Sequence, residues 1–213
     1  MNNTTELVFI LDRSGSMDPL TKDTIGGFNS LLREQREKDG GCLVTTVLFN
    51  SRMQRVHDRL DICEVPEMTE KDYRANGSTA LIDAIGETIG HIEKVHKYIR
   101  PEDVPEHTLF MITTDGLENA SRMHTSDEVK QMIERKKKDG WEFVFVGANI
   151  DAVETARAFG IDRDHAVDYE SDGEGTKILY SNLSKLASNV RANAAYDSSW
   201  SEESKAYHEK KRK

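Results

Sequence analysis

The feature that most constrains the fold is an unbroken apolar run, Leu7–Leu11, followed at once by the polar run Asp12–Ser16. Five consecutive apolar residues, with aromatic and β-branched side chains among them, are typical of a strand buried on both faces, as in a parallel sheet. In open α/β sheets, ligands bind beyond the carboxyl ends of the strands. One carboxylate and two hydroxyls spaced two residues apart can converge on a hard cation such as Mg²⁺. We therefore expect an α/β sheet with a metal site at the end of its first strand.

Strand-like and helix-like stretches alternate along the whole chain. The predicted strands cover Leu7–Leu11, Leu43–Phe49, Met53–Leu60, Leu109–Ile112, Phe143–Val146 and Ala166–Tyr169. The predicted helices run from about Thr21 to Lys38, Ala80 to Ile99, Ser126 to Lys138, Asp151 to Phe159 and Glu174 to Ala194, with Ser126 and Asp151 as N-caps. Helices between strands require crossover connections, which predict a mostly parallel sheet covered on both faces. The stretch 53–60 follows a turn-like pair and is predicted to be an antiparallel edge strand.

Length and composition indicate one domain. At 213 residues, with 31% charged and 37% apolar residues, the chain has the size and polarity of a single soluble α/β domain. We expect this domain to cover residues 1–195, followed by a polar C-terminal tail over 196–213 whose basic end, Lys210–Lys213, is frayed. The net charge of −9 argues against a nucleic-acid binder, whose surface is normally basic.

No feature of the sequence predicts export or a membrane anchor. The N-terminus lacks the basic region of a signal peptide, and no apolar stretch approaches the ~20 residues of a spanning helix. Cys42 and Cys63 lack metal or redox spacing and are interpreted as buried free thiols, although the sequence leaves a disulfide open. These observations predict a cytoplasmic protein.

Three segments place oxygen-bearing side chains where predicted strands end or helices begin. They are Asp12–Ser16, Asn76–Thr79 and Thr113–Gly116. Because neighbouring parallel strands end at one edge of a sheet, Asp12 and Asp115 can face each other although about a hundred residues separate them. Thr79, at a helix N-terminus, can approach the same place from the side. We expect the three segments to form one site.

These segments resemble the metal-ion-dependent adhesion site (MIDAS) of von Willebrand factor A (vWA) domains. The family pattern is D-x-S-x-S, then a Thr in a later loop, then an Asp in a T/S-D-G segment, and the matching positions are Asp12, Ser14, Ser16, Thr79 and Asp115. The stretches 11–17 and 78–85 are most similar to the intracellular bacterial members. The order of strands and helices agrees over nearly the whole chain. The resemblance therefore implies a doubly wound, Rossmann-like vWA fold with one antiparallel edge strand.

The resemblance also implies a role for each matching residue. Ser14 and Ser16 would give hydroxyl oxygens to Mg²⁺, with Mn²⁺ or Ca²⁺ as alternatives, and Thr79 would bind directly or through water. Asp12 and Asp115 would act mostly through water or hydrogen bonds. With neutral hydroxyls around it, the ion keeps much of its charge and can accept an Asp or Glu from a partner protein. The expected function is a Mg²⁺-dependent protein-interaction module without catalysis.

Two other functions stay open at this point. A metal-assisted hydrolase or phosphotransferase could use Asp12 and Asp115. Against it, Ser14 stands where aspartyl phosphatases carry a second Asp, no Walker motif is present, and no histidine adjoins Ser14 or Ser16 in the sequence. Alternatively, the metal could only brace the loops. Nearby, Asp83 is expected to make a structural hydrogen bond. Glu118 and Asn119 are expected to be solvent-exposed loop residues, with a place on the binding face as the alternative.

Overall fold

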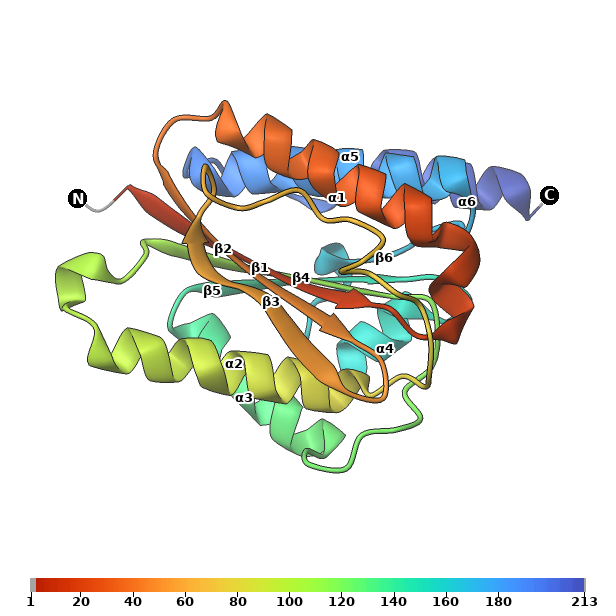
Figure 1. Cartoon of the computed structure of the whole chain (residues 1–213), viewed down its shortest axis with the longest axis horizontal. Helices are drawn as coiled ribbons and strands as arrows, with labels where there is room; N and C mark the ends of the chain where they lie inside the picture. Colours follow the sequence, from red (N-terminus) through yellow and green to blue (C-terminus); the bar gives the residue numbers. More distant parts are fainter. Residues whose placement is uncertain (1–2, 213) are drawn as a thin grey trace.

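The computed structural model describes residues 3–212, which form a six-stranded sheet between two layers of helices (Figure 1). The strands are β1 (Thr4–Asp12), β2 (Gly41–Phe49), β3 (Met53–Asp61), β4 (His107–Thr114), β5 (Trp141–Gly147) and β6 (Ala166–Asp168). The α-helices are α1 (Thr21–Arg36), α2 (Leu81–Tyr98), α3 (Ser126–Lys138), α4 (Ala152–Ala158), α5 (Gly173–Arg191) and α6 (Glu202–Lys211). Short 3₁₀ helices are η1 (Gly15–Leu20), η2 (Pro101–Asp103), η3 (Arg163–His165) and η4 (Ser198–Ser201).

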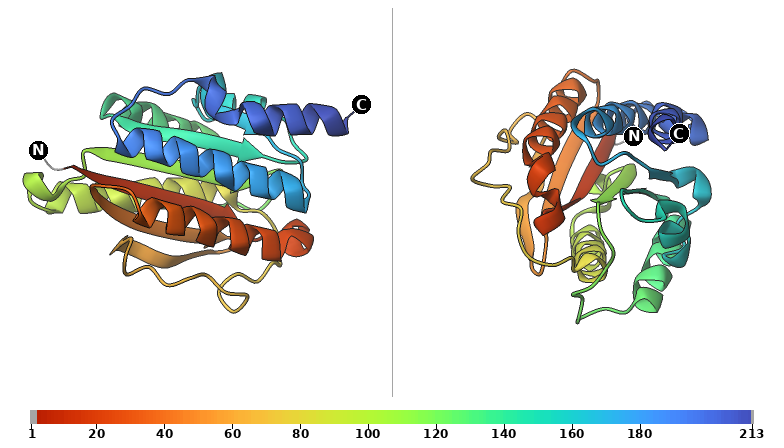
Figure 2. Two further views of the ribbon diagram at one scale, coloured as in Figure 1. Left: turned by 90° about the horizontal axis from the view of Figure 1, so that it is seen from above. Right: turned by 90° about the vertical axis from the view of Figure 1, so that its right-hand side faces the viewer.

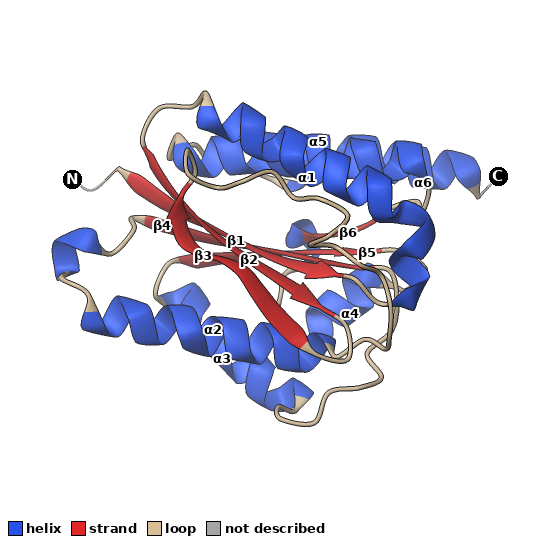
Figure 3. Ribbon diagram, viewed as in Figure 1, coloured by secondary structure: helices blue, strands red, loops and turns tan. Residues whose placement is uncertain are grey.

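The strand order is β3-β2-β1-β4-β5-β6, with β1 in the interior of the sheet (Figure 3). β1 pairs in parallel with both β2 and β4, and β5 and β6 continue the parallel pairing on the β4 side. Within residues 3–212, the one antiparallel strand is β3, which lies at the edge of the sheet and pairs with β2. This arrangement confirms the predicted doubly wound sheet and its antiparallel edge strand. The chain turns outward in opposite directions from β1, so the topological switch point lies between β1 and β4.

The apolar run that opens the sequence is buried on both faces of the sheet. Leu7, Phe9 and Leu11 pack into the cluster that contains the buried side chains of α1 and α5. Val8 and Ile10 pack into the cluster formed with α2, α3 and α4. The two further views show the two helical layers on opposite sides of the sheet (Figure 2). Because successive side chains of a strand point to opposite faces, only a continuous apolar run satisfies both cores.

Close packing of α1 on α5 depends on a glycine. A Cβ added at Gly27 would overlap the side chain of Tyr180, a residue of α5. Gly26, its neighbour, has nothing within 4 Å of the corresponding position. Gly27 therefore lets the two helices approach, and the flexibility that glycine adds to a helix is offset at this position by the contact with Tyr180.

Two details differ from the sequence-based expectation. The N-cap of α3 is Thr125, not Ser126, because Thr125 and Glu128 form a reciprocal capping box. Cys42 is buried as predicted, whereas Cys63 is exposed, and both are free thiols.

Within residues 3–212, no helix has both the length and the apolar composition that crossing a membrane requires.

Much of the segment expected to be a polar tail forms η4 and α6, which pack against α5 and β6. Trp200 is buried, and its indole Nε1 donates a hydrogen bond to the carbonyl oxygen of Asp164 at 2.9 Å. The helix reaches Lys211, so the basic end that we expected to be frayed is helical as far as this residue. The buried indole, together with polar contacts such as that of Asn182 with Ser204 at 2.8 Å, attaches this segment to the domain.

Candidate metal centre

The five residues predicted to bind a metal lie together at the carboxyl end of the sheet, beside the switch point. We call the set Asp12, Ser14, Ser16, Thr79 and Asp115 the metal rim. The loops that carry it are joined by backbone hydrogen bonds, from the N–H of Gly15 to the carbonyl of Gly77 at 3.0 Å and from the N–H of Asn76 to the carbonyl of Arg13 at 2.9 Å. Four members of the rim are buried, and Ser16 is exposed. The rim therefore opens to solvent at Ser16.

Asp12 is held firmly at the end of β1. Its Oδ1 accepts from the backbone N–H of Ser14 at 2.7 Å, and its Oδ2 accepts from the hydroxyl of Thr114 at 2.6 Å. The hydroxyl of Tyr73 donates to its backbone carbonyl. Burial raises the pKa of Asp12 above its ordinary value, although the hydrogen bonds from Thr114 and Ser14 act in the opposite direction. A nearby cation would stabilise the charged form of this buried carboxylate.

A chain of hydroxyl and carboxylate oxygens links the two aspartate-bearing loops. The hydroxyl oxygens of Ser14 and Ser16 lie 3.1 Å apart, and Ser16 donates to Oδ1 of Asp115 at 2.6 Å. Burial raises the pKa of Asp115 above its ordinary value, in spite of the hydrogen bond from Ser16. Asp115 directly follows β4, so the expected meeting of β1 and β4 residues takes place in the fold.

Thr79 reaches the same group of oxygens from the loop before α2. A Cβ built on Gly116 would lie 3.8 Å from the hydroxyl oxygen of Thr79 and 3.9 Å from that of Ser16. Asn119 holds Thr79 in place: its Oδ1 accepts from the N–H of Thr79 at 2.9 Å, and its own N–H donates to the carbonyl of Thr79 at 3.0 Å. Asn119 is exposed, as predicted, but no local pattern indicates its contact with Thr79, because the two residues are forty positions apart.

Two carboxylates fasten the loop after β4 to the start of α2. Glu118 accepts from the N–H of Ile82 at 2.8 Å and from the N–H groups of Ala120 and Ser121 at 2.7 Å each. It is half-buried, so the expectation of an exposed loop residue is wrong. Asp83 accepts from the N–H groups of residues 122, 123 and 124, which confirms the predicted structural hydrogen bond. Burial alone would raise the pKa of Asp83, but these three donors lower it.

The metal rim carries two carboxylates, and within residues 3–212 no side-chain cation forms an ion pair with either Asp12 or Asp115. No three His, Cys, Asp or Glu side chains gather into a metal-binding group anywhere in residues 3–212, so the donors here are two carboxylates and three hydroxyls. An all-oxygen set of this kind suits Mg²⁺ or Mn²⁺ rather than a soft metal. The donors present therefore fit a hard divalent cation.

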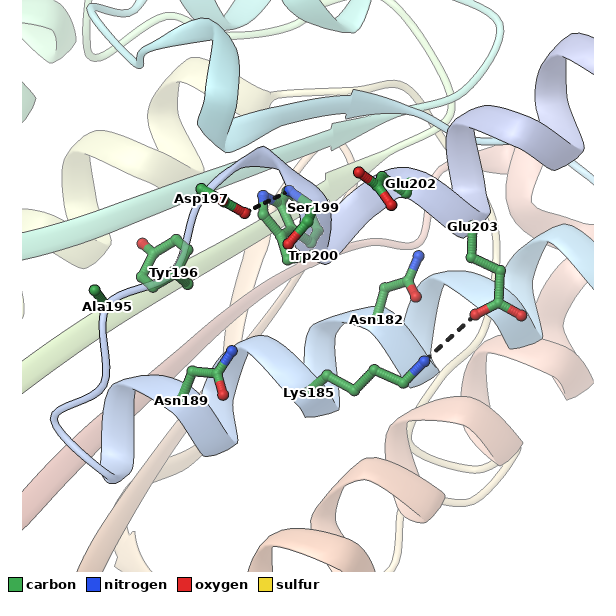
Figure 4. Close-up of a pocket in the computed structure, with 10 residues that line it drawn as sticks. All are labelled: Asn182, Lys185, Asn189, Ala195, Tyr196, Asp197, Ser199, Trp200, Glu202 and Glu203. Atoms are coloured by element: carbon green, nitrogen blue, oxygen red, sulfur yellow. Dashed lines mark hydrogen bonds and ion pairs between the residues drawn. The ribbon is translucent and has the colours of Figure 1, made fainter.

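A hollow of about 630 Å³ lies away from the metal rim, between α5, η4 and α6 (Figure 4). We call it the hairpin hollow. Its charged side chains are exposed: Lys185 lies 3.4 Å from Glu203, Asp197 accepts from the N–H of Ser199 at 2.9 Å, and Glu202 faces solvent. No residue of the metal rim lines it, so the hollow and the rim are separate features.

No protein-family model matches the sequence, and no curated protein matches it. Solved structures share its fold at low sequence identity. One is proximal thread matrix protein 1 from the mussel byssus with a zinc-occupied MIDAS motif (TM-score 0.57, 18% identity, 86% of this chain and 46% of that chain). Another is manganese-loaded TRAP protein from Plasmodium vivax (TM-score 0.55, 16% identity, 84% and 72%). This chain spans about half the length of the mussel protein.

A third similar structure is the vWF domain of the type V pili tip protein Mfa5 from Porphyromonas gingivalis (TM-score 0.59, 9% identity, 86% of this chain and 94% of that chain). The Mfa5 structure is thus matched over nearly its whole length. The strand order, the antiparallel edge and the two helical layers are those of a Rossmann-like α/β domain. The fold of this chain is that of a vWA domain.

Proposed function

We propose that this chain is a vWA domain of the intracellular bacterial type, that its metal rim binds Mg²⁺, and that it is a Mg²⁺-dependent protein-interaction module rather than an enzyme. The observation that carries the proposal is the convergence of two buried carboxylates and three hydroxyls, with no protein cation among them in residues 3–212. The similar mussel and Plasmodium structures, described as zinc-occupied and manganese-loaded, support the choice of a divalent ion.

Each rim residue has a role in this proposal. Ser14, Ser16 and Thr79 offer neutral hydroxyl oxygens to the ion, and Asp12 and Asp115 offer charge and hydrogen bonds that orient the ligands around it. Bound Mg²⁺ supplies a positive centre that takes a carboxylate oxygen from an Asp or Glu of a partner protein. Asn119 positions Thr79 through its two hydrogen bonds to the backbone of that residue.

The surface around the rim also favours a protein contact. Large apolar side chains exposed in the described part of the chain are Tyr98, Leu117 and Met123, and the last two lie on the loop that follows Asp115. Leu117 is 67% exposed and Met123 is 63% exposed. Exposed apolar groups beside a polar centre are typical of interaction surfaces. A partner that brings a carboxylate to the ion would pass close to Leu117, two positions after Asp115.

The hydrolase alternative gains no support from the contacts of the two serines. A serine nucleophile needs a neighbouring general base, most often histidine. In the described part of the chain, Ser14 and Ser16 contact each other, and Ser16 contacts Asp115, but neither has a hydrogen bond to a histidine. We therefore propose no catalytic residues.

The test compares metal binding and partner capture in three proteins: the wild type, Asp12→Ala and Asp197→Ala. Asp197 is a matched control because it is an exposed capping aspartate in the hairpin hollow. Isothermal titration with MgCl₂ and MnCl₂ should give a 1:1 isotherm for the wild type and Asp197→Ala, and no heat above dilution for Asp12→Ala. Equal binding by all three proteins would contradict the metal assignment.

The partner arm uses the same three proteins, immobilised and exposed to extract of the source cells with Mg²⁺ or with EDTA. We expect proteins to be retained by the wild type and by Asp197→Ala in Mg²⁺, and to be lost in EDTA or with Asp12→Ala. Retention that survives both EDTA and Asp12→Ala would contradict metal-dependent binding even if the titration shows a bound ion.

A further inference from the structure

A second hollow, of about 470 Å³, lies beside the metal rim. Four of the side chains that line it are cationic: Arg13, Arg52, Lys71 and Arg74. Its single acidic lining residue is Asp72. We call this hollow the basic pocket. A cluster of positive charge is unexpected in a chain whose net charge is −9.

The basic pocket and the metal rim share their loops. Arg13 stands between the rim residues Asp12 and Ser14. Its backbone N–H donates to the carbonyl of Phe49 at 2.7 Å, and its carbonyl accepts from the N–H of Asn76 at 2.9 Å. Asn76 also lines the pocket, three positions before Thr79. Because Arg13 and Asn76 belong to the loops that carry the rim, we expect one extended segment of a partner to contact the rim and the pocket together.

None of the four cations forms an ion pair with another side chain within residues 3–212. Two weaker contacts with Asp72 are present: Arg13 donates from its guanidinium to the backbone carbonyl of Asp72 at 3.3 Å, and Lys71 adds to the lowering of the Asp72 pKa by Thr69. The carboxylate of Asp72 is engaged by Thr69, from its N–H at 2.9 Å and from its hydroxyl at 2.7 Å. In addition, the buried Nε atom of Arg13 has no hydrogen-bond partner. A buried N–H donor of a guanidinium without an acceptor is costly unless a ligand supplies one.

We propose that the basic pocket binds a second carboxylate of the partner segment whose first carboxylate reaches the metal rim. This inference rests on the proposed function and narrows it, because the partner must present an acidic stretch rather than a lone Asp or Glu. Guanidinium groups match carboxylates in geometry and charge, and a positive patch also speeds the approach of an acidic chain. None of the described residues lining the pocket is aromatic, so it lacks the stacking surface typical of single-stranded nucleic-acid sites.

The experiment measures the fluorescence anisotropy of a short labelled peptide in which glutamate alternates with serine. The pocket variant is Arg52→Glu with Lys71→Glu, two exposed residues outside the metal rim. Its matched control is Lys94→Glu with Lys97→Glu, two exposed cations on α2 with the same change in charge. We expect the pocket variant to bind the peptide at least roughly tenfold more weakly than the wild type and the control. Its Mg²⁺ isotherm should match that of the wild type.

Other arms separate this inference from the proposed function. If the pocket variant and the control bind the peptide with equal affinity, the basic pocket does not bind the second carboxylate. The same conclusion follows if the wild type fails to bind the peptide at millimolar concentration. If a labelled oligo-dT binds the wild type more tightly than the peptide does, and the pocket variant loses this binding, the pocket is a nucleic-acid site. That result also contradicts the proposed binding of a second carboxylate. If EDTA and Asp12→Ala leave peptide binding unchanged, the metal contact fails, and with it the joint binding that we propose. Loss of peptide affinity in the pocket variant, beside an intact Mg²⁺ isotherm, supports the inference.

Discussion

The metal rim and the hairpin hollow both contain carboxylates, yet these carboxylates are buried at the rim and exposed in the hollow. In the hairpin hollow, Lys185 pairs with Glu203, and Trp200 is buried against the fold. At the metal rim, Asp12 and Asp115 are buried without a cation in the described chain. The hairpin hollow has a volume of about 630 Å³, but its charged side chains are exposed, so solvent stabilises them. Unbalanced buried charge, rather than the size of a hollow, identifies the site that calls for a ligand.

The comparison also concerns stability. A buried carboxylate that has hydrogen bonds but no cation beside it lowers the free energy of unfolding where burial outweighs those bonds, because the folded state then disfavours its charge. Proteins tolerate this cost at binding sites, where the bound ligand offsets it. The hairpin hollow, in contrast, contributes to stability through packing of an indole. The two regions should therefore respond in opposite ways to substitution.

The largest expected effect is that of Trp200→Ala in the hairpin hollow. Removing a buried indole and its hydrogen bond to Asp164 should lower the free energy of unfolding by about 3–5 kcal/mol. The rise in thermal midpoint caused by Mg²⁺ should persist, because the rim is separate. Thermal unfolding by circular dichroism, with and without Mg²⁺, measures both. Loss of the Mg²⁺ response while the variant is still folded would show that the two regions are coupled.

The next effect is that of Asp115→Asn at the metal rim, which should have two consequences. Without metal, the variant should be more stable than the wild type by about 1 kcal/mol, because a buried charge is removed while the amide oxygen can still accept from Ser16. With Mg²⁺ at a hundred times its dissociation constant, the wild type should gain about 2.7 kcal/mol and the variant almost nothing. Urea unfolding in EDTA and in Mg²⁺ checks both. A variant less stable in EDTA would break the contrast between the regions.

A smaller effect is expected for Asn119→Ala, which removes the side-chain half of the contact with Thr79. Partners that orient metal ligands typically change affinity by about 10–100-fold when removed. We expect a decrease of that size in Mg²⁺ affinity by titration, while the domain stays folded. Asn189→Ala is the matched control, since Asn189 lines the hairpin hollow. If both variants bind Mg²⁺ like the wild type, Asn119 does not position the site.

The sequence predicted the sheet and the rim because both leave local patterns. The run Leu7–Leu11 must be apolar to meet two cores, so it predicted an interior strand. Asp12 and Asp115 could be predicted because polar residues at the ends of buried strands break the apolar pattern abruptly, and the resemblance to the MIDAS motif implied the full set with Ser14, Ser16 and Thr79. Parallel pairing then requires the ends of β1 and β4 to meet.

The parts that could not be predicted depend on contacts between distant residues. Glu118 and Asn119 read as loop residues, because their partners are backbone groups of α2 and of the segment before it. α6 has polar side chains on all sides, so no apolar stripe distinguished it from a tail. The cap of α3 was different: Thr125 and Glu128 have the spacing of a capping box, a local signal that favours Thr125 over Ser126.

The smallest expected effect concerns His57, which is buried away from both regions, with its Nδ1 3.0 Å from the hydroxyl of Thr46. Burial lowers the pKa of His57, although Asp72 acts in the opposite direction. The unfolded chain therefore binds this proton at a higher pH than the folded protein, and stability should fall as pH falls through about 6.5. The loss between roughly pH 7.5 and 5.5 is limited to about 1.4 kcal/mol. Urea unfolding should show a shallower pH slope for His57→Gln than for the wild type or the partly exposed control His107→Gln. Equal slopes in all three would mean that the protonation of His57 does not oppose folding. Burial would then disfavour the charged form of the rim carboxylates but not that of His57.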